Sequence, residues 1–165
     1  MQTIKKIMVP IAFSPYSQGI IDYAAMLARS LNIEKLIFIN IINERDVEAV
    51  GTISSFGYKG IDEEQYVEEI QKQRATELDV LLENIDFPSE RMKLIMAVGN
   101  PAQKLLQKAL KEEIDMIVMG LKAKSELLHV LTGSVAEKLF RRSPITIVSY
   151  RDEKIARQLR KRIHE

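Results

Sequence analysis

Residues 114–119 read Ile-Asp-Met-Ile-Val-Met, a short apolar run that is interrupted only by Asp115 and followed by Gly120. Strands that are buried on both faces of a parallel sheet have this composition. Similar short runs rich in Ile and Val occur at residues 6–11, 36–42, 92–98 and 145–148. The sequence therefore predicts a set of buried strands spread along the whole chain.

Amphipathic stretches separate these runs. In the first, apolar residues recur at intervals of three and four between Ile20 and Leu31, which is the spacing of a helix with one buried face. Ser14-Pro15 predicts the start of this helix, with Ser14 as its cap. The other predicted helices cover about residues 62–84, begin at Asn100-Pro101 and begin near Ser134.

The alternation of strands and helices predicts an α/β fold. Right-handed crossovers give such a chain a parallel sheet with helices on both faces. Ligands of these sheets bind beyond the carboxyl ends of the strands, where the strand order reverses. Residues 43–61 show no clear period and carry three Gly and two Ser, so they are predicted to form a long, mobile loop.

Composition excludes several classes of function. The chain has 165 residues, a length that predicts one domain, and its net charge of +1 argues against a nucleic-acid binder. It has no Cys and only two His, so thiol chemistry and a three-His metal site are excluded, and we expect no metal. No apolar run reaches the roughly 18 residues of a membrane span, and Pro10 ends the first run too early for a signal peptide. We therefore expect a cytoplasmic protein with no membrane partner.

Features of a phosphate site lie between the predicted strand at residues 114–119 and the predicted helix that begins near Ser134. Gly120 permits a sharp turn or a close backbone approach to a ligand. Gly133-Ser134 precedes a helix, whose N-terminus attracts anions, and Lys122 and Lys124 add positive charge nearby. The stretch matches neither a P-loop nor G-x-G-x-x-G. The plainer interpretation, in which both glycines are turn residues and Ser134 is a helix cap, stays open.

Several segments together resemble the universal stress protein family, in its order and spacing, over about residues 3–150. They are residues 7–11 (Ile-Met-Val-Pro-Ile), the helix start with Ser14 and Ser17 followed by Tyr23-Ala24, residues 98–101 (Val-Gly-Asn-Pro), residues 114–120, residues 133–138 (Gly-Ser-Val-Ala-Glu-Lys) and residues 143–148 (Ser-Pro-Ile-Thr-Ile-Val).

The resemblance implies a fold and an assembly. It implies a Rossmann-like, five-stranded parallel sheet in the order 3-2-1-4-5, within one universal stress protein domain at residues 1–150. It also implies a homodimer that pairs through the last strand, at residues 145–149 from Ile145 to Ser149. This strand would be an edge of the sheet and would need cover.

The resemblance also implies a ligand. Family members that bind ATP carry Gly-x-x-Gly, nine residues and Gly-Ser or Gly-Thr; here Ala123 replaces the second Gly. The family's Asp after the first strand, which can accept hydrogen bonds from the nucleoside, is Ala12, and one such charge-assisted bond is worth about 1.5–3 kcal/mol. The phosphate end of the site is thus largely kept and the nucleoside end is weakened. The implied contacts of ATP or another adenine nucleotide are Pro10, Ile11, Ala12, Ile41, Met119, Gly120, Lys122, Ala123, Gly133, Ser134 and Val135.

The predicted function is a non-enzymatic stress-response binding module. A catalytic nucleophile needs a base within reach, and His129 is the only His inside the domain, so no catalytic residue is predicted. Asp115 is expected at the start of its strand, away from the ligand end. Two alternatives stay open: a family member without nucleotide that acts as a scaffold for an unidentified protein partner, and a slow nucleotide hydrolase.

Charge is distributed unevenly along the chain. Residues 62–83 hold eight acids and two bases, and residues 151–165 hold six bases and three acids. Ile155, Leu159 and Ile163 recur every four residues, so residues 151–165 are predicted to form a basic helical extension with a narrow apolar stripe. Docking of this extension within the protein's own dimer, on the acidic 62–83 helix or on an anionic surface remain alternatives.

Overall fold

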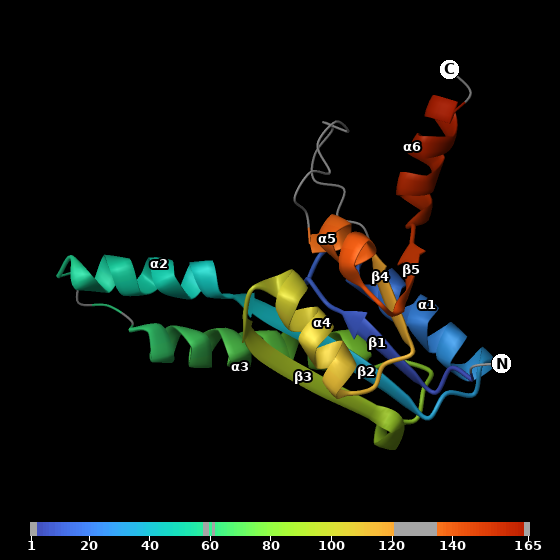
Figure 1. The fold of residues 1–165 in the computed structure, drawn as a ribbon, viewed down its shortest axis with the longest axis horizontal. Helices are drawn as coiled ribbons and strands as arrows, with labels where there is room; N and C mark the ends of the chain where they lie inside the picture. The colour runs from blue at the N-terminus through green and yellow to red at the C-terminus, as the bar shows by residue number, and fades with distance from the viewer. Residues whose placement is uncertain (1–2, 58–59, 61, 121–134, 164–165) are drawn as a thin grey trace.

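The computed structural model describes residues 3–57, 60, 62–120 and 135–163 (Figure 1). In these ranges, the elements follow one another as β1 (Lys6–Pro10), α1 (Ser17–Ser30), β2 (Lys35–Asn43), α2 (Glu44–Ser55), α3 (Glu63–Leu82), a short 3-10 helix (Ser89–Arg91), β3 (Met92–Gly99), α4 (Pro101–Lys111), β4 (Met116–Gly120), α5 (Val135–Arg142), β5 (Thr146–Tyr150) and α6 (Glu153–Ile163).

The strands form one parallel sheet in the order β3-β2-β1-β4-β5. β1 lies at the centre, where Met8 is level with Ile37 of β2 and Ile117 of β4. The chain adds β2 and β3 on one side of β1 and then returns to add β4 and β5 on the other. The predicted fold and strand order are confirmed, and the reversal falls between β1 and β4.

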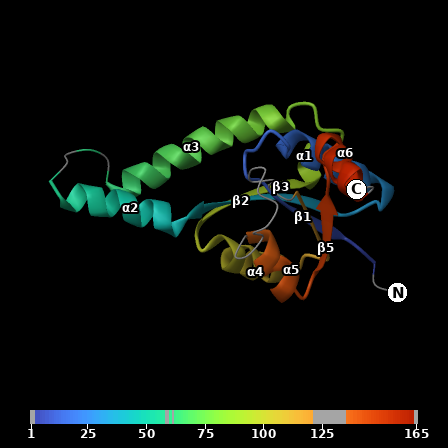
Figure 2. The same cartoon turned by 90° about the horizontal axis from the view of Figure 1, so that it is seen from above.

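Two apolar layers hold the helices against the sheet. Figure 2 shows α1 and α3 over one face of the sheet and α4 and α5 over the other. Alternate residues of a strand point to opposite faces. Val9 and Phe38 therefore pack with α1 and α3 on one face, and Met8 and Ile37 pack with α4 and α5 on the other. β1 and β2 are buried on both faces, as their unbroken apolar runs predict.

The helix caps were predicted with mixed success. Asn100 caps α4 as predicted, because its side chain accepts a hydrogen bond from the backbone N–H of Gln103 at 3.3 Å. The predicted cap at Ser14 is wrong, since α1 begins only at Ser17. The Ser14 hydroxyl instead accepts a hydrogen bond from the N–H of Tyr16 at 3.3 Å, which closes a local turn before the helix.

The predicted loop at residues 43–61 is wrong over Glu44–Ser55, which form α2. The Asn43 side chain accepts a hydrogen bond from the N–H of Arg45 at 3.1 Å and caps the helix. Glu44 and Asp46 add negative charge at its positive end. None of its residues is buried, because α2 packs along α3 rather than on the sheet. A helix with so little buried surface has too weak an apolar period to be recognised in the sequence.

Candidate functional site

The candidate site lies at the carboxyl ends of β1 and β4, where the strand order reverses. Ile7 pairs with Met116 and Met8 with Ile117, so continuing this register brings Pro10 level with Met119. Pro10 ends β1 and Gly120 ends β4. The fold therefore brings the predicted ligand contacts at residues 10–12 close to those at residues 119–120. More than a hundred residues separate these two groups in the chain.

The backbone after β1 is held by a buried polar bridge. The N–H of Ile11 donates to the carbonyl of Ile39 at 2.8 Å, and the Nδ2 of Asn40 donates to the carbonyl of Ile11 at 2.7 Å. Arg74 of α3 in turn donates from Nη1 to the Oδ1 of Asn40 at 2.6 Å. Asn40 is only 4% exposed, so both polar ends of its side chain need these partners.

This bridge fixes the position of Ala12. Ile11 is buried, while Ala12 is exposed and carries only a methyl group. Sequence reasoning missed Asn40 and Arg74. A signal was present for Asn40, because it is a polar residue inside the apolar run of β2. No signal marked Arg74 within the charged surface pattern of α3.

The end of β4 is packed closely against α1. A Cβ added to Gly120 would lie 2.4 Å from the Cδ1 of Ile20, so the absence of a side chain at Gly120 is needed for this contact. Met119 is 6% exposed and belongs to the core on the α4 side. Gly120 thus has a packing role of its own. This role does not conflict with the predicted approach of a ligand to its backbone.

Two more predicted contacts flank these strand ends. Ile39 pairs with Pro10, so Ile41 extends two residues past the end of β1 and packs partly against the α4-side core. Val135 opens α5 and is 38% exposed. Lys122, Ala123, Gly133 and Ser134 are also predicted contacts, and like Lys124 and His129 they lie outside the described residues.

Tyr150 is a neighbour of the site that sequence reasoning missed. It pairs with Gly120 across β4 and β5, and its ring lies 5.3 Å from the ring of Tyr23 on α1. Burial, and then the charges of Asp152, Asp22 and Glu153, raise the pKa of its hydroxyl above the ordinary value. The ring therefore contributes a neutral, packed wall beside the end of β4.

Asp115 lies away from the strand ends that form the site. Asp115 accepts hydrogen bonds from the N–H groups of Lys5 and Lys6 at 2.8 and 2.9 Å, at the start of β1 and β4. This confirms its expected place at the opposite edge of the sheet. Within the described ranges, no three His, Asp or Glu side chains are grouped so that they could hold a metal ion.

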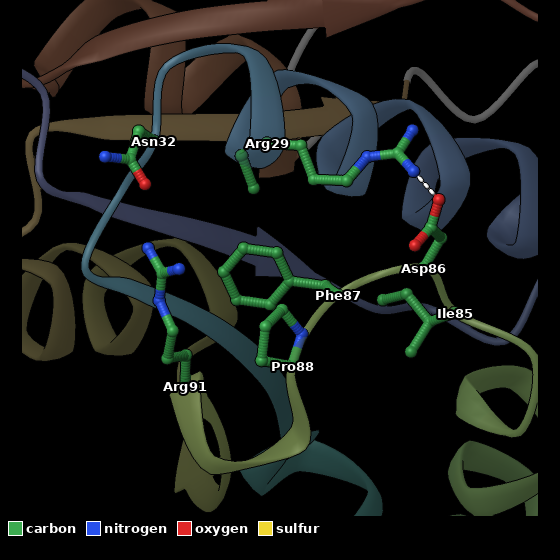
Figure 3. Close-up of a pocket in the computed structure, with 8 residues that line it drawn as sticks. Arg29, Asn32, Ile85, Asp86, Phe87, Pro88 and Arg91 are labelled. Atoms are coloured by element: carbon green, nitrogen blue, oxygen red, sulfur yellow. Dashed lines mark ion pairs between the residues drawn. The ribbon is translucent and has the colours of Figure 1, made fainter.

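A separate hollow of about 520 Å³ opens at the amino ends of β2 and β3 (Figure 3). Phe87 lies at its centre, with the guanidinium of Arg91 5.1 Å from its ring centroid, and Arg29 forms an ion pair with Asp86 at the rim. This hollow is at the other edge of the sheet from the strand ends described above. A doubly wound sheet binds its ligand at the carboxyl edge, so we place the candidate site there.

Comparison with known proteins agrees with the observed fold. The model of the family described as "Universal stress protein family" matches residues 3–151. The chain is 28% identical over 153 residues to universal stress protein MJ0577 of Methanocaldococcus jannaschii, a match that covers 87% of this chain and 94% of that protein. A solved structure of MJ0577 superposes with a TM-score of 0.71 at 24% identity, over 92% of this chain and 99% of that one.

Two other solved structures share the fold and contain nucleotides. A universal stress protein in complex with cAMP has a TM-score of 0.62 at 19% identity, covering 91% of this chain and 98% of that one. A universal stress protein from Archaeoglobus fulgidus in complex with dAMP has a TM-score of 0.59 at 15% identity, covering 91% of this chain and 100% of that one.

Proposed function

Because the chain belongs to the universal stress protein family, we propose that it binds an adenine nucleotide at the carboxyl edge of its sheet and acts as a non-enzymatic stress-response module. The observation that carries the proposal is the convergence of Pro10, Ile11 and Ala12 with Met119 and Gly120 at the point of strand reversal. The cAMP and dAMP complexes of proteins with this fold support an adenine ligand, since adenine is common to both nucleotides.

The proposed contacts divide between the two ends of the ligand. Pro10, Ile11, Ala12 and the backbone of Ile41 face the nucleoside, with Met119, Gly120 and Val135 beside it. Lys122, Ala123, Gly133 and Ser134 hold the phosphates, with the Ser134 hydroxyl and neighbouring N–H groups as donors.

The nucleoside end has lost one polar contact through Ala12. A carboxylate at this exposed position would add a charge-assisted hydrogen bond of about 1.5–3 kcal/mol, or roughly 10- to 150-fold in affinity. The backbone that carries residue 12 is nevertheless rigidly placed by the Asn40 bridge. The nucleoside end of the proposed site therefore keeps the position of this backbone and lacks one acceptor.

Calorimetric titration with ATP and Mg²⁺ tests this proposal. We expect the natural chain to bind and Ala12→Asp to bind roughly 10- to 150-fold more tightly. Ala49→Asp is the matched control, because Ala49 is exposed on α2 and far from the strand ends along the chain. No heat at about 1 mM nucleotide in either the natural chain or Ala12→Asp would contradict the proposal.

We also propose that two copies pair through β5 and that the protein works in the cytoplasm. β5 is an edge of the sheet, so its outer row of backbone N–H and C=O groups is open to pairing with a second strand. Among the described residues, no helix has both the length and the apolar character that crossing a membrane requires.

A further inference from the structure

Two strongly charged surfaces lie at opposite ends of the sheet. The first, which we call the arm, consists of residues 44–56 and 62–73, from α2 and the first half of α3. Figure 1 shows it reaching out beyond the sheet on the side of β2 and β3. The arm holds eight acids and two bases, a net charge of −6. Its apolar residues Ile53 and Phe56 are 57% and 77% exposed.

The second surface is α6, which reaches out from the end of β5 at the other edge of the sheet (Figures 1 and 2). Over Glu153–Ile163 it holds five bases and one acid, a net charge of +4. None of its residues is buried, and Ile163 at the end of its apolar stripe is 80% exposed.

Both surfaces keep charges that form no ion pair with any other described residue. Glu153 of α6 pairs with Arg157 and Arg160 on the same helix, whereas Lys154 and Lys161 form no ion pair within the described part of the chain. On the arm, Glu68 pairs with Lys72.

Three further acidic residues of the arm are unpaired. The carboxylates of Glu48, Glu64 and Glu69 have no ion-pair partner among the described residues. All three residues are exposed. The arm therefore presents open negative charge, as α6 presents open positive charge.

We propose that α6 of one copy docks on the arm of a second copy of this chain. The two surfaces are opposite in charge, and each combines its charges with exposed apolar side chains. Their lengths also match, since α6 has 11 residues and α2 has 12, or about 16 and 18 Å. The figures place the arm and α6 of one chain at opposite ends of the sheet, so the contact is made between copies.

The contact is heterologous, because two different surfaces meet. If each copy gives its α6 to the other's arm, two such contacts form and the assembly closes as a pair. The contact uses neither the β5 edge nor the carboxyl ends of β1 and β4. It therefore uses other surfaces than the proposed β5 pairing and nucleotide binding.

Cross-linking gives a local test because the chain has no Cys. Ser54→Cys on the arm and Gln158→Cys on α6 are prepared separately, mixed and treated with a short bismaleimide; both positions are exposed. We expect a cross-linked heterodimer whose yield falls severalfold in 1 M salt, where the screening length shrinks to about 3 Å. Glu90→Cys, exposed at the amino edge of the sheet, replaces Ser54→Cys in the matched control and should give little product.

Charge reversal then tests the cause. Lys154→Glu, Lys161→Glu and Arg162→Glu together change the net charge of α6 from +4 to −2, and Glu48→Lys, Glu64→Lys and Glu69→Lys change that of the arm from −6 to 0. Each set, introduced into both partners, should remove the cross-link. Mixing a copy reversed on α6 with a copy reversed on the arm should restore it, through the remaining natural arm and natural α6.

Three results would overturn the proposal. One is equal cross-linking with the Glu90→Cys control. The second is cross-linking that persists in the charge-reversed variants. The third is binding of the natural chain to vesicles of anionic lipid, lost when α6 is charge-reversed, while Ser54→Cys and Gln158→Cys give no cross-link, which would assign the basic helix to a membrane surface. All substituted side chains are exposed, so circular dichroism should show the same folded state in every variant.

Discussion

Replacing Asn40 with Ala should destabilise the fold and displace the loop that carries Ala12. Asn40 is 4% exposed and makes hydrogen bonds of 2.7 Å to the carbonyl of Ile11 and 2.6 Å to Arg74. Ala leaves the Ile11 carbonyl without this partner, at a cost of about 1–3 kcal/mol, and removes a bond to a charged group worth about 1.5–3 kcal/mol. Arg74 is only half-buried and regains water, so we expect a total loss of about 2–4 kcal/mol.

Urea and thermal unfolding followed by circular dichroism measure this loss. In a chain of this length, about 1 kcal/mol lowers Tm by roughly 2–4 °C, so the expected drop is about 5–15 °C. Asn84→Ala is the matched control, because Asn84 is exposed at the end of α3 and should cost less than about 0.5 kcal/mol. A free energy of unfolding for Asn40→Ala within about 0.5 kcal/mol of the Asn84→Ala value would refute the reasoning.

A double-mutant cycle separates the two halves of the bridge. Arg74→Ala alone leaves the Oδ1 of Asn40 without its donor, while the bond from Asn40 to Ile11 stays in place. Because Asn40 and Arg74 contact each other, the double variant should lose less than the sum of the single losses, with a coupling of about 0.5–3 kcal/mol. Additive losses would mean that Arg74 supports the fold without supporting Asn40.

Two further predictions concern the end of β4. Gly120→Ala should lower the free energy of unfolding by about 1–3 kcal/mol, because the new Cβ would lie 2.4 Å from the Cδ1 of Ile20. The Ile20→Val background lacks that atom, so unfolding measurements should show a smaller cost of Gly120→Ala there. An equal cost in both backgrounds would contradict this cause. The raised pKa of Tyr150 stabilises the fold below the ordinary tyrosine pKa of about 10, and this contribution is lost as pH rises through the higher folded value. Urea unfolding between about pH 8 and 11 should therefore show a steeper loss for the natural chain than for Tyr150→Phe, and parallel curves would contradict the assignment.

The sequence predicted the sheet well because β1 and β2 are buried on both faces and therefore carry unbroken apolar runs. It failed at α2, whose stability comes from its cap at Asn43 and from α3 rather than from a buried face. The site divides in the same way. Pro10 and Gly120 could be predicted as site residues because apolar runs mark the ends of their strands. The Asn40–Arg74 contact could not be predicted, because it joins residues 34 positions apart and depends on how α3 packs.

Ala12 and Asn40 act on the same loop through different physics, and their variants should separate. Ala12 is exposed, so Ala12→Asp should change nucleotide affinity and leave the free energy of unfolding within about 0.5 kcal/mol of the natural value. Asn40→Ala should lower both, because it releases the Ile11 carbonyl that places residue 12. If Ala12→Asp lowered stability as much as Asn40→Ala, the methyl group of Ala12 would be part of the packing rather than a free position beside the ligand. The two variants, measured by titration and unfolding together, thus distinguish a site that lacks one acceptor from a loop that has no room for a ligand.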